Sequence, residues 1–207
     1  MKSFADIAFT APVKALQTRA GSRAAYARAE RADGADDTDD EEGLGRHEAA
    51  HLANADSFYL ATVNGAGWPY IQHRGGPRGF LRVLSPSRLA FADFGGNRQF
   101  ISVGNTTEND RVSLIVVDYP HRRRLKLLGR LRFEPVESAD PALLRAVDVA
   151  GYKARVERIA VIEVEAFDWN CPQHITPRFT LEEIEAASKP LHDRIAQLEA
   201  EVEALRR

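Results

Sequence analysis

Residues 68–105 read WPYIQHRGGPRGFLRVLSPSRLAFADFGGNRQFISVGN, in which short aromatic and β-branched runs alternate with Gly, Pro and Asn. Comparable runs continue on both sides of this stretch, from Ser57 to Phe167. The seven runs are SFYLATVN (57–64), WPYIQHR (68–74), GFLRVL (79–84), RLAFADF (88–94), RVSLIVVDY (111–119), RLKLLGRLRF (124–133) and RIAVIEVEAF (158–167). Runs of this kind are typical of an antiparallel sheet or barrel and not of alternating strands and helices. The sequence therefore predicts a mainly β fold.

Turn and helix signals lie between and before these runs. The segment NGAG at 64–67 supplies the positive-φ residues that a tight hairpin needs. Residues 97–107 predict a helix, and Asp140 followed by proline predicts the N-cap of another helix over 140–150. Residues 12–31 are rich in Ala and Arg, which predicts a helix on the surface of the main domain or of a partner subunit.

The composition excludes several classes of protein. The 207 residues include 28 Lys and Arg, 30 Asp and Glu and one cysteine, and the formal charge of −2 argues against nucleic acid or an anionic membrane as partner. The single Cys171 cannot form an internal disulfide, which indicates a reducing compartment. No apolar block suits a signal peptide, and no stretch reaches the roughly 20 apolar residues of a membrane-spanning helix. We therefore expect a cytoplasmic protein.

The charge is unevenly distributed along the chain. Residues 33–42, DGADDTDDEE, hold seven of the 30 acidic residues, so that 23 acids stand against 28 Lys and Arg elsewhere. A run that repels itself and has no large apolar side chain predicts a solvated linker. We therefore expect an N-terminal helical extension (1–32), an acidic linker (33–43), a barrel domain (44–179) and a C-terminal helix (180–207).

The C-terminal segment predicts an amphipathic helix. Thr180 and Glu183 form the pattern of a capping box. Beyond it, apolar residues recur with a seven-residue period, interrupted by Ser188 and by Pro190, which lacks a backbone donor. The periodic residues are Leu181, Ile184, Leu191, Ile195, Leu198, Val202 and Leu205. We expect the pattern to restart after Pro190, and a helix so short needs a partner helix or its own domain to pack against.

The opening stretch also contains a candidate anion site. Gly75-Gly76-Pro77 allows the backbone to turn and to approach a ligand closely, and Asn97-Arg98-Gln99 stands at the expected start of a helix. Free N–H groups at a helix N-terminus, with an adjacent arginine, suit a phosphate. Arg74 and Arg98 could bind the same dianion; the alternative is two tight hairpins with surface arginines.

These residues carry a resemblance to a known family. The runs YIQHRGGPRGFLRV (70–83) and LAFADFGGNRQFISVGNTTENDRVSLIVVDYPHRRRLKLLGRLRF (89–133) resemble the pyridoxamine 5'-phosphate oxidase-like FMN-binding split barrels, especially the oxidase-related flavin-nucleotide-binding branch. The resemblance spans roughly 44–175. It implies a six-stranded antiparallel split β-barrel and a homodimer, with FMN held at the subunit interface by residues of both chains.

The resemblance also implies which residues contact FMN, although it assigns no catalytic group. Gln99 stands where the family usually has lysine, so one positive charge on the phosphate is missing. The implied FMN-binding residues are Gln72, His73, Arg74 and Gly75 on one strand, Phe91, Ala92 and Asp93 with Asn97, Arg98 and Gln99 after another, then Arg124, Gln173 and His174.

The true oxidases bind pyridoxal phosphate with the motif Arg-Leu-His-Asp-Arg. Leu191-His-Asp-Arg194 matches four of those residues but falls within the heptad pattern, so we interpret it as coincidence. We therefore expect an FMN-dependent oxidoreductase of unknown small substrate, and not a pyridoxamine phosphate oxidase. The alternatives are a non-catalytic flavin or haem carrier, with an axial ligand among His47, His51, His73, His121 and His174, and a barrel that binds the deazaflavin F420.

His47-Glu-Ala-Ala-His51 matches the zinc motif H-E-x-x-H, in which the two histidines bind the metal and the glutamate acts as base. The motif has no downstream histidine extension and little apolar surface around it, so a short surface helix leading into the barrel is the favoured interpretation. Cys171 is either a redox group near the flavin or an apolar filler.

Overall fold

The computed structural model describes residues 1–32, 43–169 and 171–206, so the acidic run 33–42 lies outside the described residues. The chain divides into two compact units. Unit 1 contains Met1–Asp118 and Arg123–Cys171, and unit 2 contains Tyr119–Arg122 and Pro172–Arg207. The barrel and the candidate site belong to unit 1.

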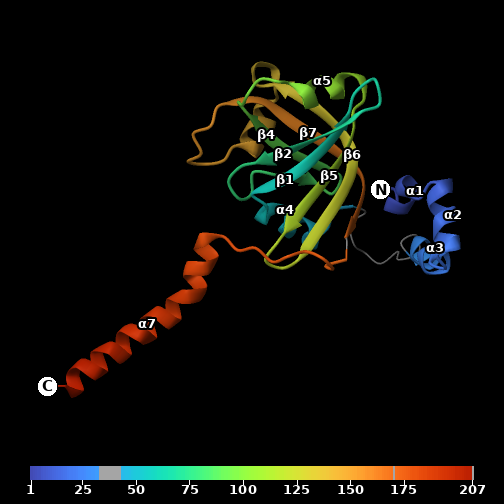
Figure 1. Ribbon diagram of the computed structural model, residues 1–207. Coiled ribbons are helices and arrows are strands. Elements are labelled where there is room, and N and C mark those ends of the chain that lie inside the picture. Colours follow the sequence, from blue (N-terminus) through green and yellow to red (C-terminus); the bar gives the residue numbers. More distant parts are fainter. Residues whose placement is uncertain (33–42, 170, 207) are drawn as a thin grey trace. The chain divides into compact units, whose positions relative to one another are not determined.

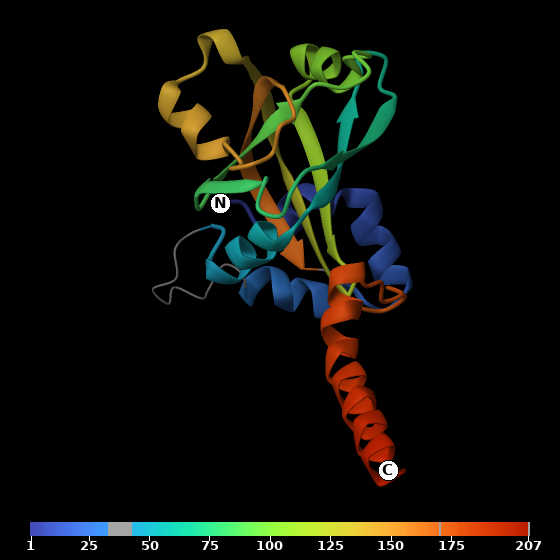
Figure 2. The same cartoon turned by 90° about the vertical axis from the view of Figure 1, so that its left-hand side faces the viewer.

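Unit 1 is built on one antiparallel sheet of seven strands in the order β2-β1-β5-β6-β7-β4-β3. Figure 1 and Figure 2 show how the sheet curls, with α5 at one end and α4 near the other. Each of the seven sequence runs contributes one strand. The strands are β1 Ser57–Val63, β2 Pro69–Gly75, β3 Arg82–Ser85, β4 Arg88–Phe94, β5 Arg111–Asp118, β6 Arg123–Pro135 and β7 Val156–Trp169.

The strand count corrects the six strands that the family resemblance implies. The short strand β3 pairs with β4 at the edge of the sheet, directly across the turn at Pro86-Ser87. The NGAG hairpin prediction is confirmed, since β1 and β2 pair in continuous register from Val63–Pro69 to Ser57–Gly75.

The sheet bends where the pairing of β6 with β7 shifts register between Leu128 and Gly129. A Cβ on Gly129 would lie 2.4 Å from the Glu163 backbone oxygen, so only glycine fits there. A glycine at an irregularity of this kind lets two long strands bend around a core.

The core fills the inside of the curled sheet. On β1, Phe58, Leu60 and Thr62 are buried in alternation with more exposed residues, as the period of a strand requires. Phe58 stacks on Phe80 and meets the edge of Phe91, with ring centroids 5.7 and 5.2 Å apart. The central residues of β4 are buried on both faces, because α6 (Pro141–Val147) packs against the outer side of the strand.

Helix α6 begins as the sequence predicts. The Asp140 side chain accepts a 2.7 Å hydrogen bond from the Ala142 N–H, and Pro141 occupies the first turn. The helix ends at Val147, three residues earlier than predicted, and a short 3₁₀ helix, Val136–Ser138, precedes it.

The single helix predicted over 12–31 is two helices in the structure. Helix α2 (Ala11–Arg19) and helix α3 (Arg23–Ala32) are separated at Gly21, whose φ of 74° ends the first helix. The preceding α1 (Phe4–Ala8) lies against β7, where the Lys2 N–H donates to the Glu165 carbonyl at 3.0 Å.

Unit 2 consists mainly of helix α7, Leu181–Leu205. The capping box is confirmed, because the Thr180 side chain accepts from the Glu183 N–H and the Glu183 carboxylate accepts from the Thr180 N–H. The helix continues through Pro190 over 25 residues, so the short helix expected in this segment is wrong. In the part of the chain that the structure describes, no helix is both long enough and apolar enough to cross a membrane.

Candidate functional site

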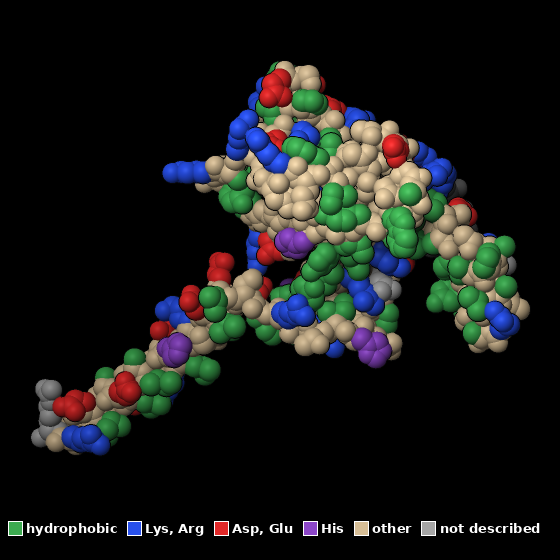
Figure 3. Space-filling view, turned by 45° about the horizontal axis from the view of Figure 1, so that its top comes forward, with side chains coloured by type: hydrophobic (Ala, Val, Ile, Leu, Met, Phe, Trp, Pro, Cys, Tyr) green, Lys and Arg blue, Asp and Glu red, His purple; other side chains and the backbone are tan. Residues whose placement is uncertain are grey.

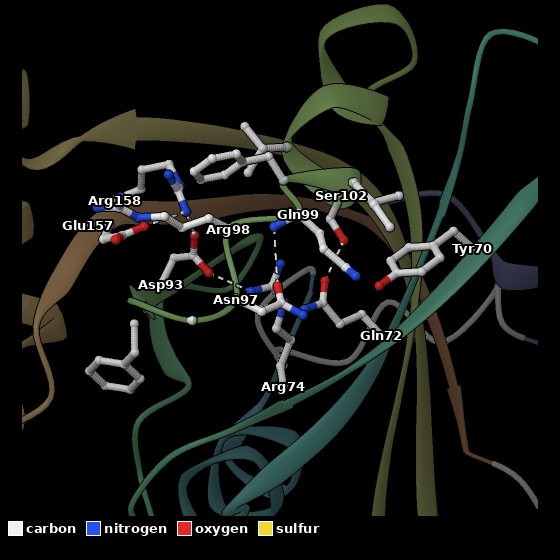
Figure 4. Close-up of a pocket in the computed structure, with 15 residues that line it drawn as sticks. Tyr70, Gln72, Arg74, Asp93, Asn97, Arg98, Gln99, Ser102, Glu157 and Arg158 are labelled. Atoms are coloured by element: carbon white, nitrogen blue, oxygen red, sulfur yellow. Dashed lines mark hydrogen bonds and ion pairs between the residues drawn. The ribbon is translucent and has the colours of Figure 1, made fainter.

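A cavity of about 270 Å³ lies in unit 1, between β2, the end of β4 and the loop that leads into α5 (Ile101–Glu108). Figure 4 shows the polar side chains that surround it. The residues that matter most for its chemistry are Gln72, Arg74, Asp93, Arg98, Ser102 and Arg158.

Strand β2 places two predicted residues in this cavity. Gln72 and Arg74 alternate with exposed neighbours along the strand, and both line the cavity. His73 lies on the opposite face, where its ring meets the edge of Tyr59 with centroids 5.6 Å apart. The strand period therefore separates His73 from the other two.

Asp93 is the centre of the charge arrangement. It is 2% exposed, and its Oδ1 accepts a 2.5 Å hydrogen bond from Arg74 Nη1 while Oδ2 accepts a 2.8 Å bond from Arg158 Nε. A buried carboxylate that accepts from two guanidinium groups fixes the position of both. Asp93 therefore holds the arginines, and an acceptor-only carboxylate is poorly suited to touch a phosphate itself.

Arg74 keeps an unused donor. Its Nε is buried and has no hydrogen-bond partner among the described residues. A buried donor without a partner costs free energy, roughly 1–3 kcal/mol, and marks a place where an acceptor is missing. Since Arg74 lines the cavity, an anionic ligand there would supply that acceptor.

The loop before α5 has an unusual backbone. Arg98 and Phe100 have φ values of 58° and 54°, in the left-handed region that non-glycine residues rarely adopt. The Asn97 side chain accepts from the Gln99 N–H at 3.2 Å and stabilises the turn. Left-handed non-glycine residues cluster at ligand sites, where the surroundings hold them in place.

Contacts on both sides hold this loop. The Arg158 guanidinium lies 5.0 Å from the centroid of the Phe100 ring. Within α5, Ser102 Oγ donates to Gln72 Oε1 at 2.9 Å, and Asn105 donates to buried Thr62 at 2.9 Å. The loop is therefore fixed to β2, β1 and β7 together.

The helix start differs from the sequence prediction. Helix α5 begins at Ile101 and not at Asn97, because the left-handed residues Arg98 and Phe100 turn the chain before the helix begins. The side chains of Asn97, Arg98 and Gln99 still line the cavity. The expected helix start at Asn97 is wrong, and the first turn of α5, Ile101 to Val103, lines the same cavity.

The donor set fits one phosphate group. Three arginines and two acids line the cavity, which leaves an excess of one positive charge. The side-chain amides of Asn97 and Gln99 add donors around it, whereas the Ser102 hydroxyl already donates to Gln72. The volume is below the range of roughly 300–1,000 Å³ that is usual for whole small-molecule sites. The cavity thus suits the phosphate end of a ligand whose remainder extends beyond it.

The other predicted residues lie elsewhere. Phe91 and Ala92 are buried in the core, and Gly75 ends β2 without lining this cavity. The Arg124 guanidinium donates to the Cys171 carbonyl at 3.3 Å and is not among the lining residues. Gln173 and His174 belong to unit 2, and their contact with FMN stays a prediction.

Sequence reasoning missed Arg158. This residue lies opposite Asp93 in the pairing of β4 with β7, two segments that are 65 positions apart in sequence. Nothing in the local pattern around Arg158 indicates which strand it will face. Knowledge of the β4–β7 register would have been needed to find it.

The H-E-x-x-H residues surround a tryptophan in the structure. Helix α4 (Arg46–Asn54) places the ring centroids of His47 and His51 4.7 and 4.8 Å from that of Trp169. The Trp169 Nε1 donates a 2.6 Å hydrogen bond to Glu48 Oε1. His51 Nε2 also lies 3.2 Å from the Val116 carbonyl, and burial lowers the His51 pKa. Among the described residues, no group of three or more His, Cys, Asp or Glu side chains could hold a metal.

No protein-family model matches the sequence, and no curated protein matches it significantly. Solved structures match the fold. HupZ from Group A Streptococcus superposes with a TM-score of 0.50 at 14% identity, over 66% of this chain and 99% of that chain. The chain shares the fold of HupZ.

Two further solved structures are similar at lower scores. A putative pyridoxamine 5'-phosphate oxidase from Lactobacillus delbrueckii has a TM-score of 0.46 at 19% identity, covering 62% of this chain and 95% of that one. An FMN-binding protein from Syntrophomonas wolfei has a TM-score of 0.45 at 15% identity, covering 60% and 85%.

Proposed function

We propose that this protein binds FMN and acts as an oxidoreductase on a small substrate. The observation that carries the proposal is the Asp93-centred arginine pair beside a cavity that fits one phosphate. FMN, when bound, supplies hydride or single-electron transfer through its ring system.

The residues of this chain bind and orient the cofactor. The buried Nε of Arg74 donates to a phosphate oxygen, and the exposed Arg98 adds a second guanidinium from the loop. Asp93 keeps Arg74 and Arg158 in place, so that these long side chains lose little further freedom on binding. Arg158 in turn holds Phe100 at the edge of the cavity.

We propose that the site is completed in a homodimer. The cavity has room for only part of FMN. On the β1–β2 hairpin, the side chains of Tyr59, Trp68 and Ile71 are 41%, 73% and 66% exposed. Large apolar side chains gathered at the edge of a sheet favour an interface with another chain. A second copy there would cover the apolar side chains of the hairpin.

The test is reconstitution followed by turnover. Purified protein incubated with FMN and desalted should stay yellow, with flavin and protein in equal amounts, and mass spectrometry of the natively bound cofactor separates FMN from F420. Consumption of NAD(P)H with a set of small acceptors separates an oxidoreductase from a carrier, which would bind FMN without turnover. A protein that retains no flavin would contradict the proposal.

A further inference from the structure

Helix α7 exposes an apolar stripe along its whole length. None of its side chains is buried, and large apolar residues on it are 42–87% exposed. Figure 3 shows green side chains following the helix. The stripe consists of Leu181, Ile184, Leu191, Ile195, Leu198, Val202 and Leu205. An isolated helix gains no stability from such a stripe, which favours a partner that covers it.

The stripe follows a heptad repeat with a defined choice of residues. After Pro190, Ile195 and Val202 occupy a positions, and Leu191, Leu198 and Leu205 occupy d positions; before it, Leu181 at a and Ile184 at d have the reverse order. β-Branched residues at a with leucine at d favour a parallel two-stranded coiled coil over higher oligomers. Ser188 is also an a residue, and only parallel, in-register pairing sets it opposite the partner's Ser188.

Pro190 lies away from the apolar stripe. Pro190 occupies a c position within α7, on the side of the helix that faces away from a and d. Its missing backbone donor therefore does not disturb the apolar contacts.

The charged residues beside the apolar stripe are complementary between two helices in the same parallel arrangement. In a parallel pair, a g residue lies beside the e residue five positions later in the partner helix. Arg194 then faces the partner's Glu199, and Glu201 faces the partner's Arg206. Within one helix, Arg194 Nη1 lies 3.8 Å from Glu201 Oε1, and both side chains are exposed. Both side chains therefore lie along one edge of the stripe. Two-fold symmetry makes four opposite-charge contacts.

We propose that the α7 helices of two copies of this chain pair as a parallel, in-register two-stranded coiled coil. The pairing covers the exposed stripe and satisfies the charges on both of its edges. This pairing goes beyond the proposed function, because it does not depend on whether the barrel binds a flavin.

Disulfide trapping in the full chain tests the arrangement. Against a Cys171→Ser background, Val202→Cys places a thiol at an a position that meets itself only in a parallel, in-register pair. Ala200→Cys, at the outward f position, is the matched control. We expect oxidised Val202→Cys protein to run mostly as a covalent dimer and the Ala200→Cys protein to stay a monomer under denaturing conditions. Equal cross-linking of both variants, or none with α7 still helical by circular dichroism, would overturn the proposal.

Charge reversal tests the partner contacts separately. Arg194→Glu should lower the association constant about five-fold, because two attractive contacts become repulsive, and the double variant Arg194→Glu/Glu199→Arg should restore it. Unrestored association in the double variant would count against the parallel register. Cross-linking between chains with Val202→Cys and chains with Leu191→Cys would show antiparallel pairing and would also overturn the proposal.

Discussion

Arg74 and Asp93 form an ion pair although four strands separate β2 from β4 in the order of the sheet. The 2.5 Å contact between Arg74 Nη1 and Asp93 Oδ1 therefore joins two strands that do not hydrogen-bond to each other. It closes the curled sheet beside the candidate site. One buried carboxylate thus serves the barrel and the phosphate-binding arginines at the same time.

Substituting Asp93→Asn should destabilise the barrel and weaken FMN binding. The change leaves the largely buried Arg74 without its counter-charge and Arg158 with Glu157 alone, and breaking a buried pair costs about 3 kcal/mol of unfolding free energy. Urea unfolding measures this loss. Glu163→Gln is the control, since its partners Arg88 and Arg132 are about half exposed and the expected cost is below about 1 kcal/mol. Equal costs for the two variants would contradict the role of Asp93.

Substituting Arg98→Ala should weaken FMN binding without destabilising the fold. Arg98 is exposed at the cavity, and a lost charge-assisted bond to phosphate costs roughly 1–3 kcal/mol of binding free energy. Fluorescence titration measures the affinity. Arg145→Ala on α6 removes the same charge away from the cavity and should leave the affinity unchanged. If the two variants bind alike, Arg98 has no part in the site.

His51 should make the fold sensitive to acid. Burial lowers its pKa, while the Val116 carbonyl and Asp118 oppose this effect and His47 and Arg123 add to it. Because the unfolded chain binds a proton more readily, the stability contributed by neutral His51 is present above the unfolded pKa of about 6.5 and is lost as the pH falls through the folded value.

The measurement is urea unfolding of the wild type and of His51→Gln between about pH 5 and 8. Glutamine can still bond to the Val116 carbonyl but does not titrate in this range. The stability of the wild type should fall more steeply on acidification than that of the variant. Parallel pH profiles would show that His51 does not control the acid response.

Gly129 and Gly104 should respond oppositely to alanine. A Cβ at Gly129 would meet the Glu163 oxygen at 2.4 Å, so Gly129→Ala should destabilise the barrel by about 1–3 kcal/mol. Gly104 lies within α5 with no atom within 4 Å of the added carbon, so Gly104→Ala should stabilise the protein by about 0.4–1 kcal/mol. Thermal unfolding of the two variants checks both signs; a Gly129→Ala protein as stable as the wild type would refute the bend at this residue.

Local signals in the sequence predict most of the fold. Short runs of aromatic and β-branched residues identify all seven strands, and the capping residues Asp140 and Thr180 mark two helix starts correctly. These features depend on near neighbours in the chain, which is why one sequence suffices. The resemblance to oxidase-like barrels adds the order of the motifs but implies one strand too few.

The parts of the site that depend on distant pairing were not predicted. Arg158 reaches Asp93 only through the β4–β7 register, and the left-handed backbone of Arg98 and Phe100 has no signature in those residue types. The H-E-x-x-H pattern shows the reverse case, a strong local motif whose side chains pack around Trp169 in the fold.

The central claim is that the Arg74–Asp93 cavity binds the phosphate of a flavin. The most direct measurement is the pair of dissociation constants of the full-length protein for FMN and for riboflavin, which differ only in that phosphate. FMN should bind at least about 100-fold more tightly than riboflavin, as two charge-assisted bonds would provide, and Arg98→Ala should bring the two dissociation constants closer together. Equal affinity for the two flavins would contradict it.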